Sequence, residues 1–212
     1  MIFLKIIFME KIYLGGKPME KRWLAVLGSP RIGKNTDTLI NHYIEELSKR
    51  GRKVDKVVLS QIEQNICSGC EYCIKNKKCY YNDEMSEIIE KIKTVEGIIL
   101  GSPSYNYNVT SYMKVFLDRL FSLFTFHKGS WSSQLDSKNI KSIIIGVCAG
   151  PDELSMGFTM EAMKRVMKDH GVEIIIEERY FGTKRNPVEI NKDIKNIITR
   201  KFNNSFNHTF IN

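Results

Sequence analysis

Hydrophobic residues follow two spacings along the chain. Short apolar runs are typical of buried strands, and apolar residues every three or four positions are typical of one face of a helix. The runs predict five strands, at 23–27, 53–59, 95–100, 140–147 and 172–176. Helical stripes lie between or after them, at 39–47, 85–92, 113–124, 156–167 and 187–197. Strands that alternate with helices predict an α/β fold with a doubly wound parallel sheet.

The stretch GSPRIGKNTDT, residues 28–38, joins the first strand to the first helix. A helix N-terminus presents backbone N–H groups without intrahelical partners, and its dipole favours an anion. Candidate phosphate ligands in this stretch are the hydroxyls of Ser29, Thr36 and Thr38, the amide of Asn35 and the guanidinium of Arg31. The stretch therefore predicts a phosphate-binding loop.

Two other interpretations of this loop stay open. A P-loop needs Ser or Thr directly after its lysine to hold magnesium, but Asn35 follows Lys34. No later strand ends in the aspartate that such a site also requires. The loop is also compatible with a Ser/Thr-rich helix cap that binds nothing. The remaining interpretation is a flavin mononucleotide loop, which holds a phosphate without a metal ion.

Ligands of doubly wound sheets bind beyond the carboxyl ends of the strands, so the later loops at that edge matter too. The third strand is followed by SPSYNYNVT, residues 102–110, in which Pro103 stiffens the backbone and Tyr105 and Tyr107 can flank a planar ring. Asn106 and backbone amides can meet the polar edge of such a ring. The alternative is a polar loop with exposed tyrosines. The loop 148–151 is small, which permits close approach of a ring.

Four of the five cysteines, Cys67, Cys70, Cys73 and Cys79, form the compact pattern C-x2-C-x2-C-x5-C. Four thiolates on one short loop can wrap a cubane cluster, each ligating one iron. A structural zinc would use the same sulfur atoms, although zinc sites commonly pair two separated knuckles. Free thiols without metal are the third interpretation. The pattern favours metal over the disulfides of a secreted protein, and we expect a cytoplasmic protein.

Length and charge set the outer limits. One main domain, 21–202, is expected for a chain of 212 residues, with the cysteine loop at 66–82 inserted in it. The formal net charge of +8 is consistent with anionic cofactors or an acidic protein partner. No basic run with interleaved aromatics argues for nucleic acid, and no stretch argues for a membrane span.

Both ends of the chain look foreign to this pattern. Residues 1–20 form a leader whose apolar part, 1–9, is too short to span a bilayer and is broken by Lys5, and the leader has no signal-peptide cleavage site. Translation starting at Met19 is one hypothesis, and an extra strand or a partner-binding arm is another. The Asn-rich end, 203–212, is expected to be loose.

The motifs GSPRIGKNT, at 28–36, and SPSYNYNVTSYMKVFLDRL, at 102–120, together with the small loop at 148–151, resemble the flavodoxin-like NAD(P)H-dependent FMN reductases. The resemblance implies a flavodoxin-like three-layer sandwich with a parallel sheet of order 2-1-3-4-5. It implies that the phosphate of FMN is held by Ser29, Arg31, Asn35, Thr36 and Thr38. It implies that the flavin is lined by Pro103, Ser104, Tyr105, Asn106 and Val109, with Ala149 and Gly150 near the ring.

The cysteine pattern resembles the cluster motif of the iron-sulfur flavoproteins within that family. This resemblance implies a [4Fe-4S] cluster on the four cysteines, transfer of electrons between ferredoxin or a similar carrier and FMN, and a small-molecule acceptor. It also implies a homodimer or homotetramer in which the cluster of one subunit serves the flavin of its neighbour. The alternatives are an NAD(P)H-dependent FMN or quinone reductase with incidental cysteines, and a non-catalytic zinc- or flavin-binding sensor.

Overall fold

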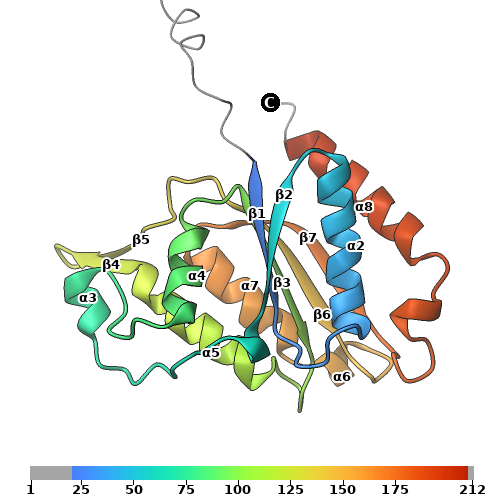
Figure 1. Cartoon of the computed structure of the whole chain (residues 1–212), viewed down its shortest axis with the longest axis horizontal. Coiled ribbons are helices and arrows are strands. Elements are labelled where there is room, and N and C mark those ends of the chain that lie inside the picture. Colours follow the sequence, from blue (N-terminus) through green and yellow to red (C-terminus); the bar gives the residue numbers. More distant parts are fainter. Residues whose placement is uncertain (1–20, 210–212) are drawn as a thin grey trace, which may run out of the picture.

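A five-stranded parallel sheet forms the centre of the molecule (Figure 1). The computed structural model describes residues 21–209. The strands of the sheet are β1 (Arg22–Leu27), β2 (Lys53–Val58), β3 (Gly97–Pro103), β6 (Lys141–Val147) and β7 (Glu173–Tyr180). Their order is β2-β1-β3-β6-β7, and every neighbouring pair is parallel. Counted along the parallel strands this is 2-1-3-4-5, which confirms the predicted flavodoxin-like sheet.

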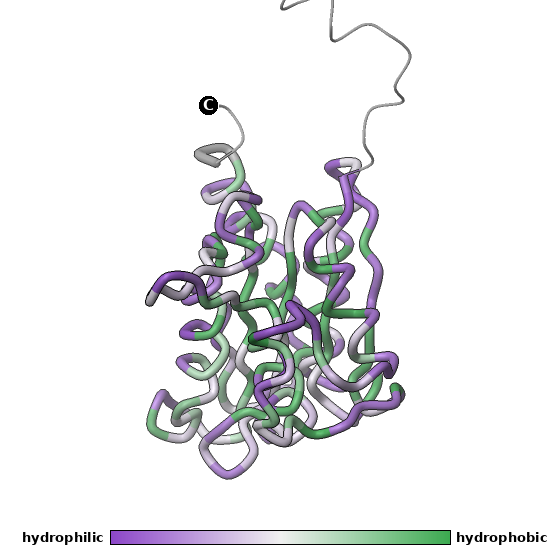
Figure 2. The backbone as a smooth tube through the Cα atoms, turned by 90° about the vertical axis from the view of Figure 1, so that its left-hand side faces the viewer, coloured by the Kyte–Doolittle hydropathy of each residue, from purple (hydrophilic) through white to green (hydrophobic). Residues whose placement is uncertain are grey.

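Helices cover both faces of the sheet and make three layers (Figure 1). One face carries α2 (Asn35–Lys49) and α8 (Ile194–Thr209), and the other carries α4 (Glu84–Ile92), α5 (Ser111–Arg119) and α7 (Thr159–Asp169). All seven residues of β3 are buried, as expected of a central strand covered on both sides. Figure 2 shows hydrophobic stretches running through the interior, with hydrophilic ones mainly toward the outside.

The side chains of β1 show how one strand supplies two cores. Successive side chains of a strand point to opposite faces of the sheet. Trp23, Ala25 and Leu27 therefore pack with the α2 and α8 layer. Leu24 and Val26 pack with the layer of α4, α5 and α7.

The predicted stripe at 113–124 is not one helix. It divides into α5, the 3-10 helix η2 (Leu120–Leu123) and the first strand of a hairpin, β4 (Phe124–His127) with β5 (Ser130–Ser133). Phe121 is 41% exposed, and its ring contacts those of Phe124 and Trp131 instead of the main core. The prediction that Phe121 and Phe124 continue the helix is wrong.

The predicted helix at 156–167 is also interrupted. α6 (Glu153–Met156) ends at Gly157, and α7 follows. Gly157 has a φ of 60°, a positive value that favours glycine. A Cβ at Gly157 would lie 2.3 Å from the carbonyl oxygen of Tyr107, so the break lets this segment approach the loop after β3 closely. Met156, Met160, Met163 and Met167 are all buried, as expected of apolar residues on one face of a helix.

The carboxyl-terminal region begins and ends differently from the prediction. Pro187 precedes the 3-10 helix η3 (Val188–Ile190), and α8 starts only at Ile194. The expectation of a loose tail from residue 203 is wrong for 203–209, because α8 continues to Thr209 and Phe206 is buried against Trp23. The predicted leader, 1–20, and residues 210–212 lie outside the described residues.

The segment between β2 and α4 lies outside the sheet. After the 3-10 helix η1 (Leu59–Gln61) it contains the four clustered cysteines and one short helix, α3 (Tyr72–Asn76). α3 lies with the β4–β5 hairpin at one end of the molecule (Figure 1). Over the described range of the chain, no helix is both long and apolar enough to cross a bilayer.

Candidate functional site

The loop after β1 has the geometry of an anion site. The first hydrogen bond of α2 runs from the N–H of Thr38 to the carbonyl of Lys34, at 2.9 Å. The N–H groups of residues 35–37 therefore precede the helical ladder. Ser29 is buried, and its hydroxyl oxygen accepts the N–H of Arg31 at 3.1 Å, which leaves the hydroxyl hydrogen to donate. The side chains of Arg31 and Lys34 are exposed beside these donors and supply positive charge.

The buried carboxylate of Asp37 fixes the conformation of this loop. Asp37 is 2% exposed and accepts the N–H of Gly33 at 2.7 Å. Its second oxygen pairs with Lys56 of β2. The contact fixes Gly33 at a φ of 71°, in the left-handed region. The sequence prediction missed Asp37, for which a place in the first turn of the helix was the only signal.

The loop after β3 is held as a tight turn. The N–H of Tyr105 donates to the carbonyl of Asn108 at 2.8 Å, and the N–H of Asn108 donates back at 3.2 Å. Asn106 and Tyr107, between them, have φ values of 48° and 65°. Ser104 anchors the turn to the neighbouring segments, because its N–H donates to the carbonyl of Val147 and its hydroxyl to that of Met156.

These loops meet around a cavity of about 90 Å³ at the carboxyl ends of the strands. It is lined by Ser29, Arg31, Lys34, Asn35, Thr36, Pro103, Ser104, Tyr105, Val147, Cys148, Ala149 and Thr183. Eight of the twelve predicted flavin residues are thus brought together: Ser29, Arg31, Asn35, Thr36, Pro103, Ser104, Tyr105 and Ala149. The cavity lies where doubly wound sheets bind their ligands.

Four predicted residues do not line this cavity. Thr38 lies one position beyond the free helix N-terminus. Val109 is buried in the hydrophobic cluster with α5. Asn106 lies on the exposed side of its turn, and Gly150 faces Ser155, to whose Cβ an added Cβ would approach within 2.2 Å.

Four lining residues were not among the predicted ligands. Val147 and Cys148 end β6, Thr183 follows β7, and Lys34 precedes α2. The N–H of Thr183 donates to the carbonyl of Cys148, so this loop closes the cavity from the β7 side. Burial raises the pKa of the Cys148 thiol. Cys148 therefore stays protonated and belongs to the wall of the cavity.

The donor set of the cavity fits a phosphate monoester. Hydroxyls, helix N–H groups and two cations converge on its phosphate end, and each interacts favourably with an oxyanion. Asn35 has a shared role, because its side-chain oxygen accepts the N–H of Val188 at 2.8 Å and only its amide hydrogens remain for a ligand. The residues present therefore fit the phosphate of FMN.

The four clustered cysteines surround a second cavity, of about 60 Å³. Three left-handed residues turn the chain around it, Gly69, Glu71 and Lys77, with φ between 56° and 67°. Burial raises the pKa of the Cys73 thiol, and the neighbouring charges of the other three cysteines raise it further. In the part of the chain that is described, no three His, Cys, Asp or Glu side chains already converge on one ion position. The donor set of four sulfur atoms around one cavity fits an iron-sulfur cluster.

A buried ion pair closes the stem of this cysteine loop. Arg119, the last residue of α5, donates from both terminal nitrogens to the two oxygens of Asp83, each at 2.8 Å. Asp83 also accepts the N–H of Asn65 at 2.9 Å and that of Ser86 at 3.0 Å. Asn65 precedes the cysteines and Asp83 follows them, so one carboxylate ties together the two ends of the loop.

The ion pair of Arg119 and Asp83 stabilises the charged form of the carboxylate. Burial by itself would raise the pKa of Asp83, but hydrogen bonds from Arg119, Asn65 and Ser86 outweigh it and hold the pKa well below its usual range. The side chains of Arg119 and Asp83 are 0% and 2% exposed. The sequence prediction did not single out Asp83, because its partner Arg119 lies 36 positions later in the chain.

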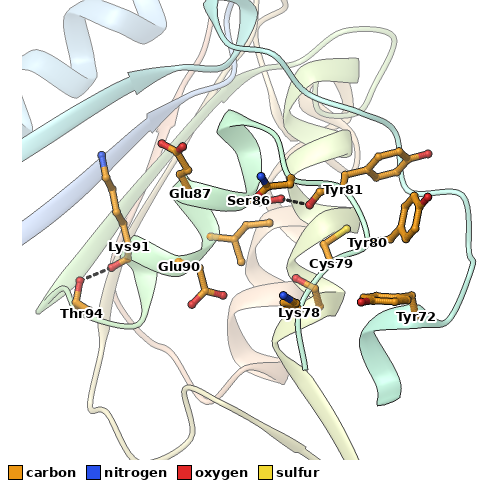
Figure 3. A pocket seen from close by; sticks show the side chains of 13 residues that line it. Tyr72, Lys78, Cys79, Tyr80, Tyr81, Ser86, Glu87, Glu90, Lys91 and Thr94 are labelled. Carbon is orange, nitrogen blue, oxygen red and sulfur yellow. Dashed lines mark hydrogen bonds between the residues drawn. The ribbon is translucent and has the colours of Figure 1, made fainter. Parts of the chain in front are cut away.

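A groove of about 740 Å³ lies beside the cysteine loop (Figure 3). The rings of Tyr72, Tyr80 and Tyr81 line one side, and Glu87 and Lys91 of α4 stand on the other (Figure 3). The ring of Tyr80 meets the other two tyrosine rings edge-on, at 5.5 and 5.7 Å. Cys79 lines both this groove and the cysteine cavity, so it is the cysteine that faces the groove.

Helix α5 connects the two cavities. Its N-cap, Thr110, donates a hydrogen bond to the carbonyl of Gly28 at 2.6 Å, in the phosphate loop, and accepts the N–H of Met113. Its last residue, Arg119, lies in the cysteine stem. Nine residues of helix span about 13 Å, so one rigid element holds both loops.

Comparison with known sequences gives consistent matches. A family model described as NADPH-dependent FMN reductase matches residues 22–142, more than half of the chain. An iron-sulfur flavoprotein of Archaeoglobus fulgidus is 32% identical over 149 residues, 70% of this chain and 63% of that protein. One of Methanosarcina thermophila is 29% identical over 157 residues, 74% and 78% of the two chains. One of Methanocaldococcus jannaschii is 35% identical over 96 residues, which are 45% of this chain and 50% of that protein. The chain thus spans less than two thirds of the first and third of these relatives.

Solved structures share the fold. An NAD(P)H:quinone oxidoreductase from Methanothermobacter marburgensis superposes with a TM-score of 0.65 at 15% identity, over 89% of this chain and 99% of that one. An FMN-dependent NADH-azoreductase from Bacillus anthracis, solved in complex with FMN, superposes with a TM-score of 0.62 at 14% identity, over 88% of this chain and 100% of that one. At such identities the likeness shows the flavodoxin-like architecture alone.

Proposed function

The chain belongs to the NADPH-dependent FMN reductase family, and on that premise we propose that it is a flavin-dependent oxidoreductase that also holds a [4Fe-4S] cluster. FMN would occupy the cavity at the ends of β1, β3 and β6, and the cluster would be held by Cys67, Cys70, Cys73 and Cys79. The function proposed is transfer of electrons between a one-electron carrier, such as ferredoxin, and an acceptor reduced at the flavin.

One observation carries this proposal: four cysteines surround a single cavity in a chain whose sheet edge forms a separate flavin-type cavity. When bound, an iron-sulfur cluster exchanges single electrons and FMN exchanges one or two, so the pair converts between carriers of the two kinds. The iron-sulfur flavoprotein names of three relatives support the same pairing.

The side chains of the flavin cavity have binding and positioning roles. Arg31, Lys34 and the start of α2 would neutralise the phosphate. Ser104, fixed by two hydrogen bonds, sets the position of the turn that carries Tyr105, whose ring is 43% exposed at the mouth. No side chain is required as a general acid or base, because the protein supplies position and charge.

The proposed carrier is an acidic protein. Lys75, Lys77 and Lys78 are exposed on the cysteine loop, and the chain carries a formal net charge of +8. Complementary charge of this kind speeds encounter between electron-transfer partners. The groove of Figure 3 exposes one face of Cys79 to such a partner. We also propose a homodimer or homotetramer, supported by the exposed aromatic side chains of Phe121, Phe126 and Trp131 next to this loop.

The test is purification without air, followed by assay of iron, acid-labile sulfide and FMN. The proposal expects four iron atoms and one FMN per chain, and faster flavin reduction by a reduced one-electron carrier than by NADPH. The result that contradicts it is FMN without iron, reduced rapidly by NADPH. That result would establish the second candidate, an NAD(P)H-dependent FMN or quinone reductase, which the description of the family model favours.

A further inference from the structure

The guanidinium of Arg119 is buried completely, and its hydrogen bonds can be counted. An arginine has five N–H donors. One terminal nitrogen donates to the carbonyl of Asn65 and to Asp83, and the other donates to Asp83 and to the hydroxyl of Ser86, all at 2.8 Å. These contacts use four of the five donors and fix the plane of the group.

The fifth donor is the N–H at Nε. It is buried, and none of the described residues accepts it in hydrogen-bond geometry. Arg119 lines the cysteine cavity, and its guanidinium interacts electrostatically with the thiol of Cys79. An unpaired buried N–H costs free energy, so a donor left in this state beside Cys79 points to the sulfur of that residue as its acceptor once the cysteines hold a ligand.

We propose that Arg119 donates its Nε–H to the Sγ of Cys79 when the cluster is bound, and that this bond raises the reduction potential of the cluster. The inference rests on the proposed function and adds a positioning residue to it. Arg119 thus has two tasks, since its terminal nitrogens hold the loop stem and its Nε addresses one ligand.

The physical reason is charge. Reduction adds negative charge to the cluster and its thiolates, and an N–H directed at a ligand sulfur stabilises that added charge. The effect is stronger where the local dielectric is low, as around the fully buried guanidinium of Arg119. Asp83 compensates much of the net charge of Arg119, so the directed Nε–H dipole is the part of the guanidinium that acts on Cys79. Because Cys79 also faces the groove, the bond acts on the ligand nearest to an incoming carrier.

Arg119→Lys isolates this bond. In lysine a CH2 group replaces Nε, while the ammonium takes the place of the guanidinium carbon and still pairs with Asp83. The substitution keeps the cation and removes the donor. We expect iron and FMN content to stay at the wild-type level and the cluster potential, measured by a spectroelectrochemical titration, to shift to more negative values. Lys114→Gln, which removes an exposed cation from the same helix, is the matched control and should leave the potential unchanged.

Asp83→Asn separates this role from a purely structural one. It weakens the same stem but removes a negative charge and retains the Nε–H, so the potential should shift to more positive values. A stem that only holds the loop predicts shifts of one sign in both variants, and that result would overturn the inference. An unchanged potential in Arg119→Lys with full iron content would also overturn it. Wild-type protein without iron contradicts instead the proposed function, so the two failures are distinct.

Discussion

The two candidate cofactor sites of this molecule are built in opposite ways. The flavin cavity is made by loops that leave buried strands of the central sheet, and its walls include core residues such as Val147 and Cys148. The cysteine cavity lies outside the sheet, on a segment with a single five-residue helix. The first site lies where doubly wound sheets bind their ligands, whereas the second is held by a segment outside the sheet that is tied together at its stem.

This difference makes the sites separable. Helix α5 reaches both, with Thr110 at the phosphate loop and Arg119 at the cysteine stem. Damage to the stem should therefore remove the cysteine site and leave the flavin site in place. Damage to the phosphate loop should do the reverse.

The largest effect is expected for Asp83→Ala. It leaves the buried Arg119 charge without its partner, and loss of one member of a buried pair costs about 3–5 kcal/mol of unfolding free energy. Urea titration of the metal-free protein measures this loss. Asp118→Ala removes an exposed partner of Lys114 on the same helix and should cost less than about 1 kcal/mol. Equal losses in the two variants would contradict the role of the stem.

The next effect concerns pH and the β4–β5 hairpin beside the cysteine loop. His170 is fully buried, lies 2.9 Å through Nδ1 from the hydroxyl of Ser133 and stacks on Phe124. Burial lowers the pKa of His170 to about 4, and the charges of Asp136 and Asp169 offset only part of that shift.

The folded pKa of His170 is below the unfolded value of about 6.5, so its contribution is complete above pH 6.5 and is lost as pH falls toward 4. We expect a loss of roughly 3 kcal/mol over that window. Denaturation at pH 7, 5.5 and 4 measures it, and His170→Gln should flatten the slope between pH 6.5 and 4. A variant with the wild-type slope would assign the pH dependence to other groups.

A smaller effect is expected at the flavin site. Arg31→Ala should weaken FMN binding by about 1.5–3 kcal/mol, the contribution of a hydrogen bond to a charged group. Riboflavin lacks the phosphate, so its affinity should change little. Fluorescence titration with both ligands measures the difference, and iron content should be unaffected. Equal weakening of FMN and riboflavin would contradict the assignment of the phosphate end.

The sheet could be predicted from the sequence because its strands are covered on both faces and appear as continuous apolar runs, as in 140–147. The phosphate loop could be predicted because all its ligands are adjacent in sequence. Site residues that are distant in sequence could not be predicted in this way. Thr183 joins the cavity only because the loop after β7 lies beside the loop after β1, whereas Lys34 lies within the phosphate loop and was not chosen as a ligand.

Two kinds of error have physical causes. Apolar spacing alone could not show that the helix ends before Phe121, which lies in a 3-10 helix, and Phe124, which begins the hairpin, because aromatic side chains outside the core give the same pattern as buried ones. The pair of Asp83 and Arg119 had no local signal, since its partners are joined only by packing of α5 against α4. The stem of the cysteine loop was therefore visible only in three dimensions.

We propose that the cysteine loop is an iron-sulfur unit that is separate from the flavin-binding sheet edge. The most direct test is the iron and FMN content of Cys70→Ala prepared without air, with Ser68→Ala from the same loop as its matched control. We expect that Cys70→Ala loses its iron, turns from brown to yellow and retains one FMN per chain, whereas Ser68→Ala keeps both iron and FMN. Full iron content in Cys70→Ala, or loss of FMN together with iron, would contradict the claim.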